Sequence, residues 1–296
     1  MLGRLEELFE KAVDIGEKRI LEMDRVGVNV QVLSLSSPGT EQMEPDKAEE
    51  VAVEVNNMVA DSIRKFPSRL SAFAALPTSN PVRAADELER TVKKLGFKGA
   101  LINGHVRGKY LDDPIFDPIF ERAEALKVPI YLHPTMPPKQ VSDVYYNGNL
   151  RPEVSLIFSV FGWGWHIETA VHLLRLILAG TFDKHPELQV MIGHLGEALP
   201  FMLDRLDQSF PPNFTGLKYP ISHYLRNNMY YTSSSLNSLP SFLNLMLQVG
   251  VDRIMFSTDY PNLPMGLSVD FLKKLPISPS DKEKISYLNA CNLMHF

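Results

Sequence analysis

Short apolar runs alternate with longer amphipathic segments along most of the chain. The runs that predict strands are rich in aliphatic and β-branched residues and cover positions 28–35, 70–76, 99–102, 128–132, 188–192, 229–232 and a last run at 254–256. Each run has the character of a strand buried on both faces rather than of an alternating, half-exposed strand. Seven strands separated by helices predict parallel pairing through right-handed crossovers.

The segments between these runs have helical spacing. Near the start, Leu5, Phe9 and Ala12 fall on one face with charged residues between them, so we expect one helix that ends at Gly27. Seven strands are one fewer than a closed (β/α)8 barrel needs, and because the chain starts with a helix, the missing strand would be the first. We therefore predict an α/β fold, a single domain over residues 1–296, built as a distorted (β/α)8 TIM-like barrel without its first strand.

One connection is longer than the others. It runs from about residue 134 to residue 165 and is rich in aromatic side chains, namely Tyr145, Tyr146, Phe158, Phe161, Trp163 and Trp165. Connections of more than about 12 to 15 residues usually serve as lids, binding loops or interfaces. This insertion is therefore as good a candidate for an oligomer contact as for the wall of a substrate site.

Composition narrows the class of protein. The chain has 296 residues, of which 45% are hydrophobic and 22% charged, and its formal net charge of −5 provides no basic field for nucleic acid. The single cysteine, Cys291, excludes a disulfide framework and a thiolate metal cluster. No apolar run approaches the roughly 20 residues needed to span a bilayer, and the start is too acidic for a signal peptide. We expect a cytoplasmic protein with neither a nucleic acid nor a membrane partner.

Three of the predicted strands lead directly to ionisable residues, His133, His194 and Asp259. Taken singly, His133 beside a proline and Asp259 after a strand also fit structural caps. His194 lies between two glycines with Glu197 three residues on, which suits a base close to a ligand. Because a parallel barrel gathers its strand ends on one face, the three together predict an active site, with imidazole and carboxylate ligands that suit zinc or manganese.

Four motifs around these residues occur in a fixed order along the chain: Tyr131-Leu132-His133-Pro134, Gly193-His194-Leu195-Gly196-Glu197, Phe256-Ser257-Thr258-Asp259-Tyr260-Pro261 and Asn289-Ala290. In this order they resemble the motifs of the amidohydrolase-2 branch of the amidohydrolase superfamily. The resemblance covers nearly all of the chain and is to the nonoxidative aromatic decarboxylases, such as γ-resorcylate and 2,3-dihydroxybenzoate decarboxylase. It implies a distorted (β/α)8 barrel, a divalent metal, an aromatic substrate and assembly as a homodimer or homotetramer.

The resemblance also implies roles for individual residues. His133 and Asp259 would be metal ligands, and Asp259 would also protonate the ring carbon that bears the carboxylate. His194 with Glu197 would polarise or protonate the substrate. As CO2 departs, the ring would regain its aromaticity.

Two further positions follow from the same resemblance, and one feature departs from it. Asn103 would line the pocket, and Arg205 would meet a carboxylate or a neighbouring subunit. The family's first strand carries a Glu-x-His or His-x-His pair that supplies two metal ligands, and no such pair occurs near the start of this sequence. Because residues 5–23 have the pattern of the helix that follows that strand, we expect the sequence to begin just after it. The metal, zinc or manganese, is therefore in question.

Three functions follow as hypotheses. The leading one is metal-dependent decarboxylation of a hydroxylated aromatic acid. The second is a metal-free lyase, isomerase or cyclase in which His133, His194 and Asp259 act as an acid and base set on a phenolic or polyketide-like substrate. The third is a non-catalytic binding or assembly protein. His105 and His166 stay open as further residues that could face the pocket.

Overall fold

The computed structural model describes residues 2–296, with side chains described from Glu6 onward. Its strands are β1 (Gln31–Leu33), β2 (Leu70–Ala72), β3 (Ala74–Ala75), β4 (Ala100–Asn103), β5 (Ile130–His133), β6 (Val190–Ile192), β7 (Met229–Thr232) and β8 (Ile254–Met255). β1 pairs with β2, and β3 to β8 pair in sequence order, all in parallel. β2 and β3 are parts of one predicted strand, interrupted at Phe73, whose N–H still donates to the Leu33 carbonyl at 2.8 Å. The prediction of seven successive strands is confirmed.

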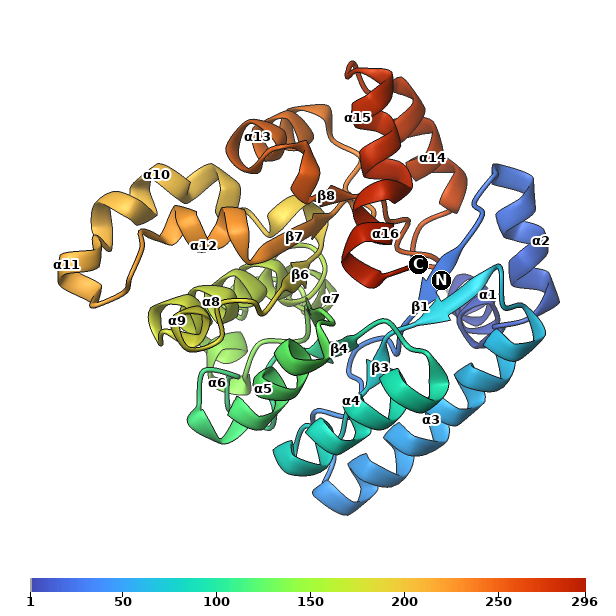
Figure 1. Ribbon diagram of the computed structural model, residues 1–296, viewed down its shortest axis with the longest axis horizontal. Coiled ribbons are helices and arrows are strands. Elements are labelled where there is room, and N and C mark those ends of the chain that lie inside the picture. Colours follow the sequence, from blue (N-terminus) through green and yellow to red (C-terminus); the bar gives the residue numbers. More distant parts are fainter. Residues whose placement is uncertain (1) are drawn as a thin grey trace.

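Helices surround the sheet, as the barrel prediction requires (Figure 1). The main ones are α3 (Pro45–Lys65), α4 (Pro81–Leu95), α5 (Asp117–Leu126), α8 (Gly164–Leu178), α10 (Leu199–Ser209), α12 (Ile221–Asn227), α13 (Leu239–Val249) and α14 (Met265–Lys274). Within residues 2–296, no helix is both long enough and apolar enough to cross a bilayer. Inside the barrel a second apolar cluster includes Phe73, Met191 and Met255, packed against Leu293 and Met294 of α16 (Asn289–Met294). The last helix therefore fills one end of the barrel interior.

The N-terminal segment forms two helices, so the prediction of one continuous helix is wrong. α1 spans Leu2–Val13 and α2 spans Glu17–Val26. The chain turns between them because Asp14 accepts the Gly16 N–H at 3.1 Å. The buried guanidinium of Arg19 then donates to the carbonyl oxygens of Asp14, at 2.7 Å, and Lys11, at 2.9 Å. Arg19 thus satisfies carbonyl groups that the end of α1 leaves without helical partners.

The two ends of the sheet lie across a gap. Within the described residues, no strand pairing joins β1 to β8. The outer backbone groups of β8 are taken by the C-terminal segment, because the Phe256 N–H donates to the Ile285 carbonyl and Asn289 donates to the Ile254 carbonyl, both at 2.8 Å. Outside the gap, α2 contacts α14 (Figure 1), and Arg19 lies 4.8 Å from the centre of the Tyr260 ring. Helices and side chains therefore bridge the position where an eighth strand would stand.

The insertion at 134–165 contains short helices of its own. They are α6 (Lys139–Val141), the π-helical turn η2 (Ser142–Tyr146) and α7 (Pro152–Ser159). Tyr146 is buried and packs edge to face with Phe158, with ring centres 5.0 Å apart, whereas Tyr145 and Trp163 are exposed. Most aromatic side chains of the insertion, including Phe158, thus reach solvent, and Tyr146 is the one that packs into its interior.

Candidate active site

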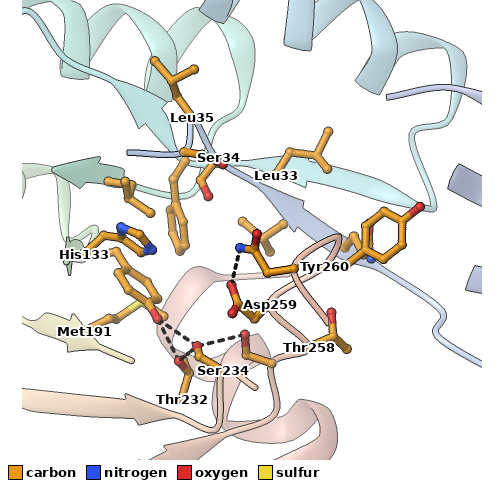
Figure 2. A pocket seen from close by; sticks show the side chains of 18 of the residues that line it. Leu33, Ser34, Leu35, His133, Met191, Thr232, Ser234, Thr258, Asp259 and Tyr260 are labelled. Carbon is orange, nitrogen blue, oxygen red and sulfur yellow. Dashed lines mark hydrogen bonds between the residues drawn. The ribbon is translucent and has the colours of Figure 1, made fainter. Parts of the chain in front are cut away.

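A cavity of about 1620 Å³ extends from the carboxyl ends of the strands along the gap between β1 and β8 to α16. His133, His194 and Asp259 all border it. Figure 2 shows His133, from the end of β5, and Asp259, from the loop after β8, on opposite sides of this space. The structure therefore brings together the three strand-end residues singled out in the sequence, next to an apolar barrel interior.

His133 is the last residue of β5, and its ring is oriented by the chain next to it. Its Nδ1 lies 2.8 Å from the Pro134 carbonyl oxygen, which can only accept, so Nδ1 carries the proton and Nε2 keeps its lone pair. Burial and, to a smaller extent, the charge of His194 lower the pKa of His133 to about 4, against the opposing effect of Asp259. A neutral imidazole with a free Nε2 is the form that binds a metal ion.

His194, His166 and Glu197 form a hydrogen-bonded triad. Glu197 is buried, and its two carboxylate oxygens accept the Nδ1–H of His194 at 2.6 Å and of His166 at 2.7 Å. The two imidazole ring centres lie 4.5 Å apart. The turn that carries His194 and Glu197 has positive φ at both residues, 49° and 53°, a conformation that non-glycine residues seldom adopt without a functional reason.

The triad favours an ion pair between His194 and Glu197. Burial lowers the pKa of His194, but the charge of Glu197 and its hydrogen bond outweigh this and raise the pKa above the ordinary value of 6.5. Burial raises the pKa of Glu197, but the charge and hydrogen bonds of the two histidines lower it below 4.5. The result is a carboxylate that holds an imidazolium, whose Nε2–H is free of that carboxylate.

Asp259 stands in a different environment. It has a positive φ of 58°, and its Oδ1 accepts one hydrogen bond, from Asn262 at 3.2 Å (Figure 2). No cationic side chain among the described residues forms an ion pair with it within 4.0 Å. The Asp259 carboxylate is therefore available for a ligand or a proton transfer at the edge of the cavity.

Two of the predicted site residues lie elsewhere. Asn103 ends β4 beside His133, but it is only 1% exposed and is not among the residues that border the cavity. Its amide donates instead to the Leu35 carbonyl at 3.3 Å, which holds the cavity wall from behind. Arg205 is exposed on α10 and is not among the residues that border the cavity.

The structure also has a chain of hydrogen-bonded hydroxyl groups in the cavity wall, which the sequence analysis did not predict. The Tyr131 hydroxyl is 2.8 Å from Thr232 and 3.2 Å from Ser234, and Ser234 donates to Ser257 at 3.2 Å (Figure 2). Burial raises the pKa of Tyr131 to about 12, so its hydroxyl stays protonated. The signal was a run of small polar residues after the predicted strand 229–232, at the face where the histidines gather.

Two arrangements of these side chains have metal-binding chemistry. Among the described residues, His166, His194 and Glu197 have ligating atoms within 4.8 Å of one another. In that group the Nδ1–H groups of His166 and His194 already donate to the Glu197 carboxylate. A cation bound between these atoms would have to displace both protons. His133 and Asp259 present a free imidazole nitrogen and a carboxylate to the cavity instead.

Comparison with known proteins relates the chain to one family. The family model described as Amidohydrolase matches residues 10–296. A γ-resorcylate decarboxylase of Polaromonas sp. (strain JS666) is 37% identical over 301 residues, which cover 97% of this chain and 89% of that protein.

Solved structures agree with the sequence match. A 2,6-dihydroxybenzoate decarboxylase complexed with 2,6-dihydroxybenzoate superposes with a TM-score of 0.91 at 36% identity, covering 98% of this chain and 91% of that one. A dihydroxybenzoic acid decarboxylase from Polaromonas sp. JS666, with bound manganese and the inhibitor 2-nitroresorcinol, has a TM-score of 0.91 at 36% identity and covers 98% of this chain and 89% of that one. The α/β TIM-like barrel is thus confirmed.

Proposed function

The chain belongs to the amidohydrolase family, and from this premise we propose that it is a lyase that decarboxylates a hydroxylated aromatic acid without oxidation. The proposal rests on the observation that His133, His194 and Asp259 all border one cavity. Relatives named γ-resorcylate decarboxylases, which are 37% identical to this chain over 97% of its length, support the same chemistry.

The residues of this chain suit the proton transfers of such a reaction. The His194 imidazolium, held by Glu197, offers a positive charge and an N–H to the anionic acid. Asp259, in its protonated form, gives a proton to the ring carbon that bears the carboxylate. The bond to the carboxylate then breaks, its electron pair returns to the ring, CO2 leaves, and Asp259 regains a proton from solvent.

His133 and Asp259 fit a divalent metal. A neutral imidazole nitrogen and a carboxylate oxygen are ligands that manganese and zinc accept. When bound there, the metal would supply an electrophilic anchor for the phenolic and carboxylate oxygens of the acid. The Pro134 carbonyl, which accepts the Nδ1–H of His133, would fix the ligand ring in the required orientation.

Metal retention separates the two candidate ligand sets. We expect His133→Ala to weaken Mn²⁺ binding by more than the roughly 10- to 100-fold that loss of a supporting group costs, and His166→Asn to leave binding nearly unchanged. Titration of Mn²⁺, followed by electron paramagnetic resonance, measures both variants. Loss of binding in His166→Asn, with retention in His133→Ala, would assign the metal to the triad instead.

Carbon dioxide release tests the proposed function itself. Purified protein supplied with Mn²⁺ should convert an acid such as 2,6-dihydroxybenzoate into resorcinol and CO2, and a chelator should abolish this turnover. Activity that survives the chelator but is lost in His194→Ala would favour a metal-free lyase. If a panel of salicylate-like acids is returned unchanged, the lyase proposal is wrong.

We also propose that the chain assembles as a homodimer or homotetramer. Phe201 on α10 is 79% exposed and Leu156 on α7 is 54% exposed, and Arg205 is exposed one turn after Phe201. Contiguous patches of exposed apolar side chains mark interaction surfaces, and Met202, next to Phe201 on α10, is also exposed. Light scattering should give at least twice the chain mass of 33.4 kDa, and Phe201→Asp should shift the mass toward one chain. A wild-type monomer at micromolar concentration would contradict this.

A further inference from the structure

The loop after β1 forms part of the cavity wall and is fastened by side chains. Ser37 and Gln42 both border the cavity. The Ser37 hydroxyl lies 3.0 Å from that of Thr135, and the Gln42 amide donates to the His105 carbonyl at 2.6 Å. Glu41 lies between these two attachments and is only 1% exposed. A buried carboxyl group therefore stands directly behind the wall that faces the ligand.

Glu41 is incompletely paired. Its Oε1 accepts the backbone N–H of Asn103 at 2.9 Å. Its Oε2 is buried without a hydrogen-bond partner, and so is Oδ1 of Asn103. Both side chains converge on Gly39, where an added Cβ would lie 2.2 Å from Glu41 Oε2 and 2.4 Å from Asn103 Nδ2. Two neighbouring side chains thus each hold a buried acceptor that lacks a donor.

One proton on Glu41 resolves both deficits. An ionised carboxylate has acceptors only, whereas a protonated carboxyl group has an O–H that can donate. Asn103 Oδ1 can accept that O–H once the amide group turns over, because the Asn103 atom that now meets Glu41 Oε2 beside Gly39 is Nδ2. A buried polar atom left unpaired costs about 1 to 3 kcal/mol. Burial also raises the pKa of Glu41 to about 7, against the lowering effect of its hydrogen bonds from Asn103.

The charged groups on the neighbouring elements do not hold Glu41 in its ionised form. His105, in the loop after β4, and His133, at the end of β5, both have pKa values lowered by burial and are neutral near pH 7. Arg107 in the same loop pairs with the exposed Glu44 at 2.7 Å. Among the described residues, no cation forms an ion pair with Glu41 within 4.0 Å.

We propose that Glu41 is a positioning residue that carries its proton at neutral pH and, as a neutral acid bonded to Asn103, holds the cavity wall in place for an anionic ligand. This inference rests on the proposed function for the identity of that ligand, an aromatic carboxylate. Loss of the proton places a negative charge behind the wall and leaves acceptors unpaired. Ligand binding therefore weakens as the pH rises through the raised pKa. The stability that the neutral acid contributes is fully present below the ordinary pKa of 4.5 and is lost as the pH rises from there to the raised pKa of about 7.

Glu41→Gln provides the sharpest test, because glutamine keeps the shape and replaces the proton with a permanent N–H donor. Calorimetry would give the Kd of 2,6-dihydroxybenzoate between about pH 6 and about pH 8.5, with saturating Mn²⁺. We expect the Kd of the wild type to rise about tenfold more over this interval than the Kd of Glu41→Gln, which keeps only the pH dependence that His194 contributes. The control Glu44→Gln, which changes an exposed acid on the same loop, should behave as the wild type.

An infrared spectrum makes the test independent of turnover and of binding. The wild type should show a protonated-carboxyl band near pH 6 that fades by about pH 8.5 and is missing from Glu41→Gln. A wild type without that band, or a Glu41→Gln variant that keeps the wild-type pH dependence of Kd, would overturn the proposal. An acid that binds with the expected pH dependence but is never decarboxylated would instead remove the proposed function and leave the role of Glu41 intact.

Discussion

Asparagine in place of Asp259 is expected to lower kcat by about 10²- to 10⁴-fold, the range that general acid catalysis contributes. Asparagine can still accept the hydrogen bond from Asn262 and can still offer an oxygen to a metal, but it cannot give a proton to carbon. Steady-state rates of CO2 release, with a stopped assay for the slow variant, measure the effect. The fold should be retained, because Asp259 is only partly buried and bonds to one side chain.

The matched control for this prediction is Asp252→Asn. Asp252 lies just before β8, is 73% exposed and pairs at 2.7 Å with Lys284 on the surface. Its replacement should leave kcat within about twofold of the wild type, as expected for a surface ion pair. A comparable loss in both variants would mean that the β8 region tolerates no change of charge, and full activity in Asp259→Asn would exclude Asp259 as the proton donor.

Replacing Glu197 with glutamine is expected to have the second-largest effect, a fall in kcat of about 10²-fold and a loss of about 3 kcal/mol of stability. The glutamine amide can accept only one Nδ1–H with its oxygen, while its NH2 group opposes the other histidine. Without the charge of Glu197, burial lowers the pKa of His194. Activity that needs the imidazolium should then disappear at a lower pH than in the wild type.

The sign of the stability change follows from the same pKa shifts. Glu197 has a lowered pKa in the folded state, so its contribution is present above the ordinary value of 4.5 and is lost as the pH falls through the lowered pKa. His194 has a raised pKa, so its contribution is lost as the pH rises above 6.5 through the raised value. Thermal unfolding of the wild type and Glu197→Gln, from below pH 4.5 to above pH 6.5, checks both the loss at low pH and the loss at high pH. Glu187→Gln, which changes an exposed acid, is the control. If the melting temperatures of the wild type and Glu197→Gln differ by the same amount at every pH, the ion pair between Glu197 and His194 is contradicted.

The strands were predictable because each is a short apolar run that must be buried on both faces. The break between α1 and α2 was not, because it depends on Arg19, whose contacts run from α1 to Tyr260 near β8. Periodicity detects an apolar stripe but gives no information on which buried side chain will take the carbonyl groups at a helix end. The helices of the insertion were missed for a similar reason, since aromatic content does not distinguish a loop from short helices.

The candidate site was predictable where it obeys the geometry of the barrel. His133, His194 and Asp259 follow strands, and parallel strands bring such residues to one face. His166 lies in the first turn of α8, just after the insertion, and its hydrogen bond to Glu197 joins segments that are 31 residues apart in the sequence. Glu41 resembles any surface acid in the sequence, and its burial behind Asn103 becomes evident only in the structure.

The central claim is that this chain cleaves the bond between an aromatic ring and its carboxylate, with a proton delivered to the ring carbon at the site of Asp259, His194 and His133. The most direct test is turnover of 2,6-dihydroxybenzoate in D2O without oxygen, with the product examined by mass spectrometry and NMR before slow exchange of ring hydrogens. We predict CO2 and resorcinol with one deuterium at the carbon that bore the carboxylate, formed by the wild type about 10²- to 10⁴-fold faster than by Asp259→Asn. Unchanged acid, or labelled resorcinol formed equally by both proteins, would contradict the claim.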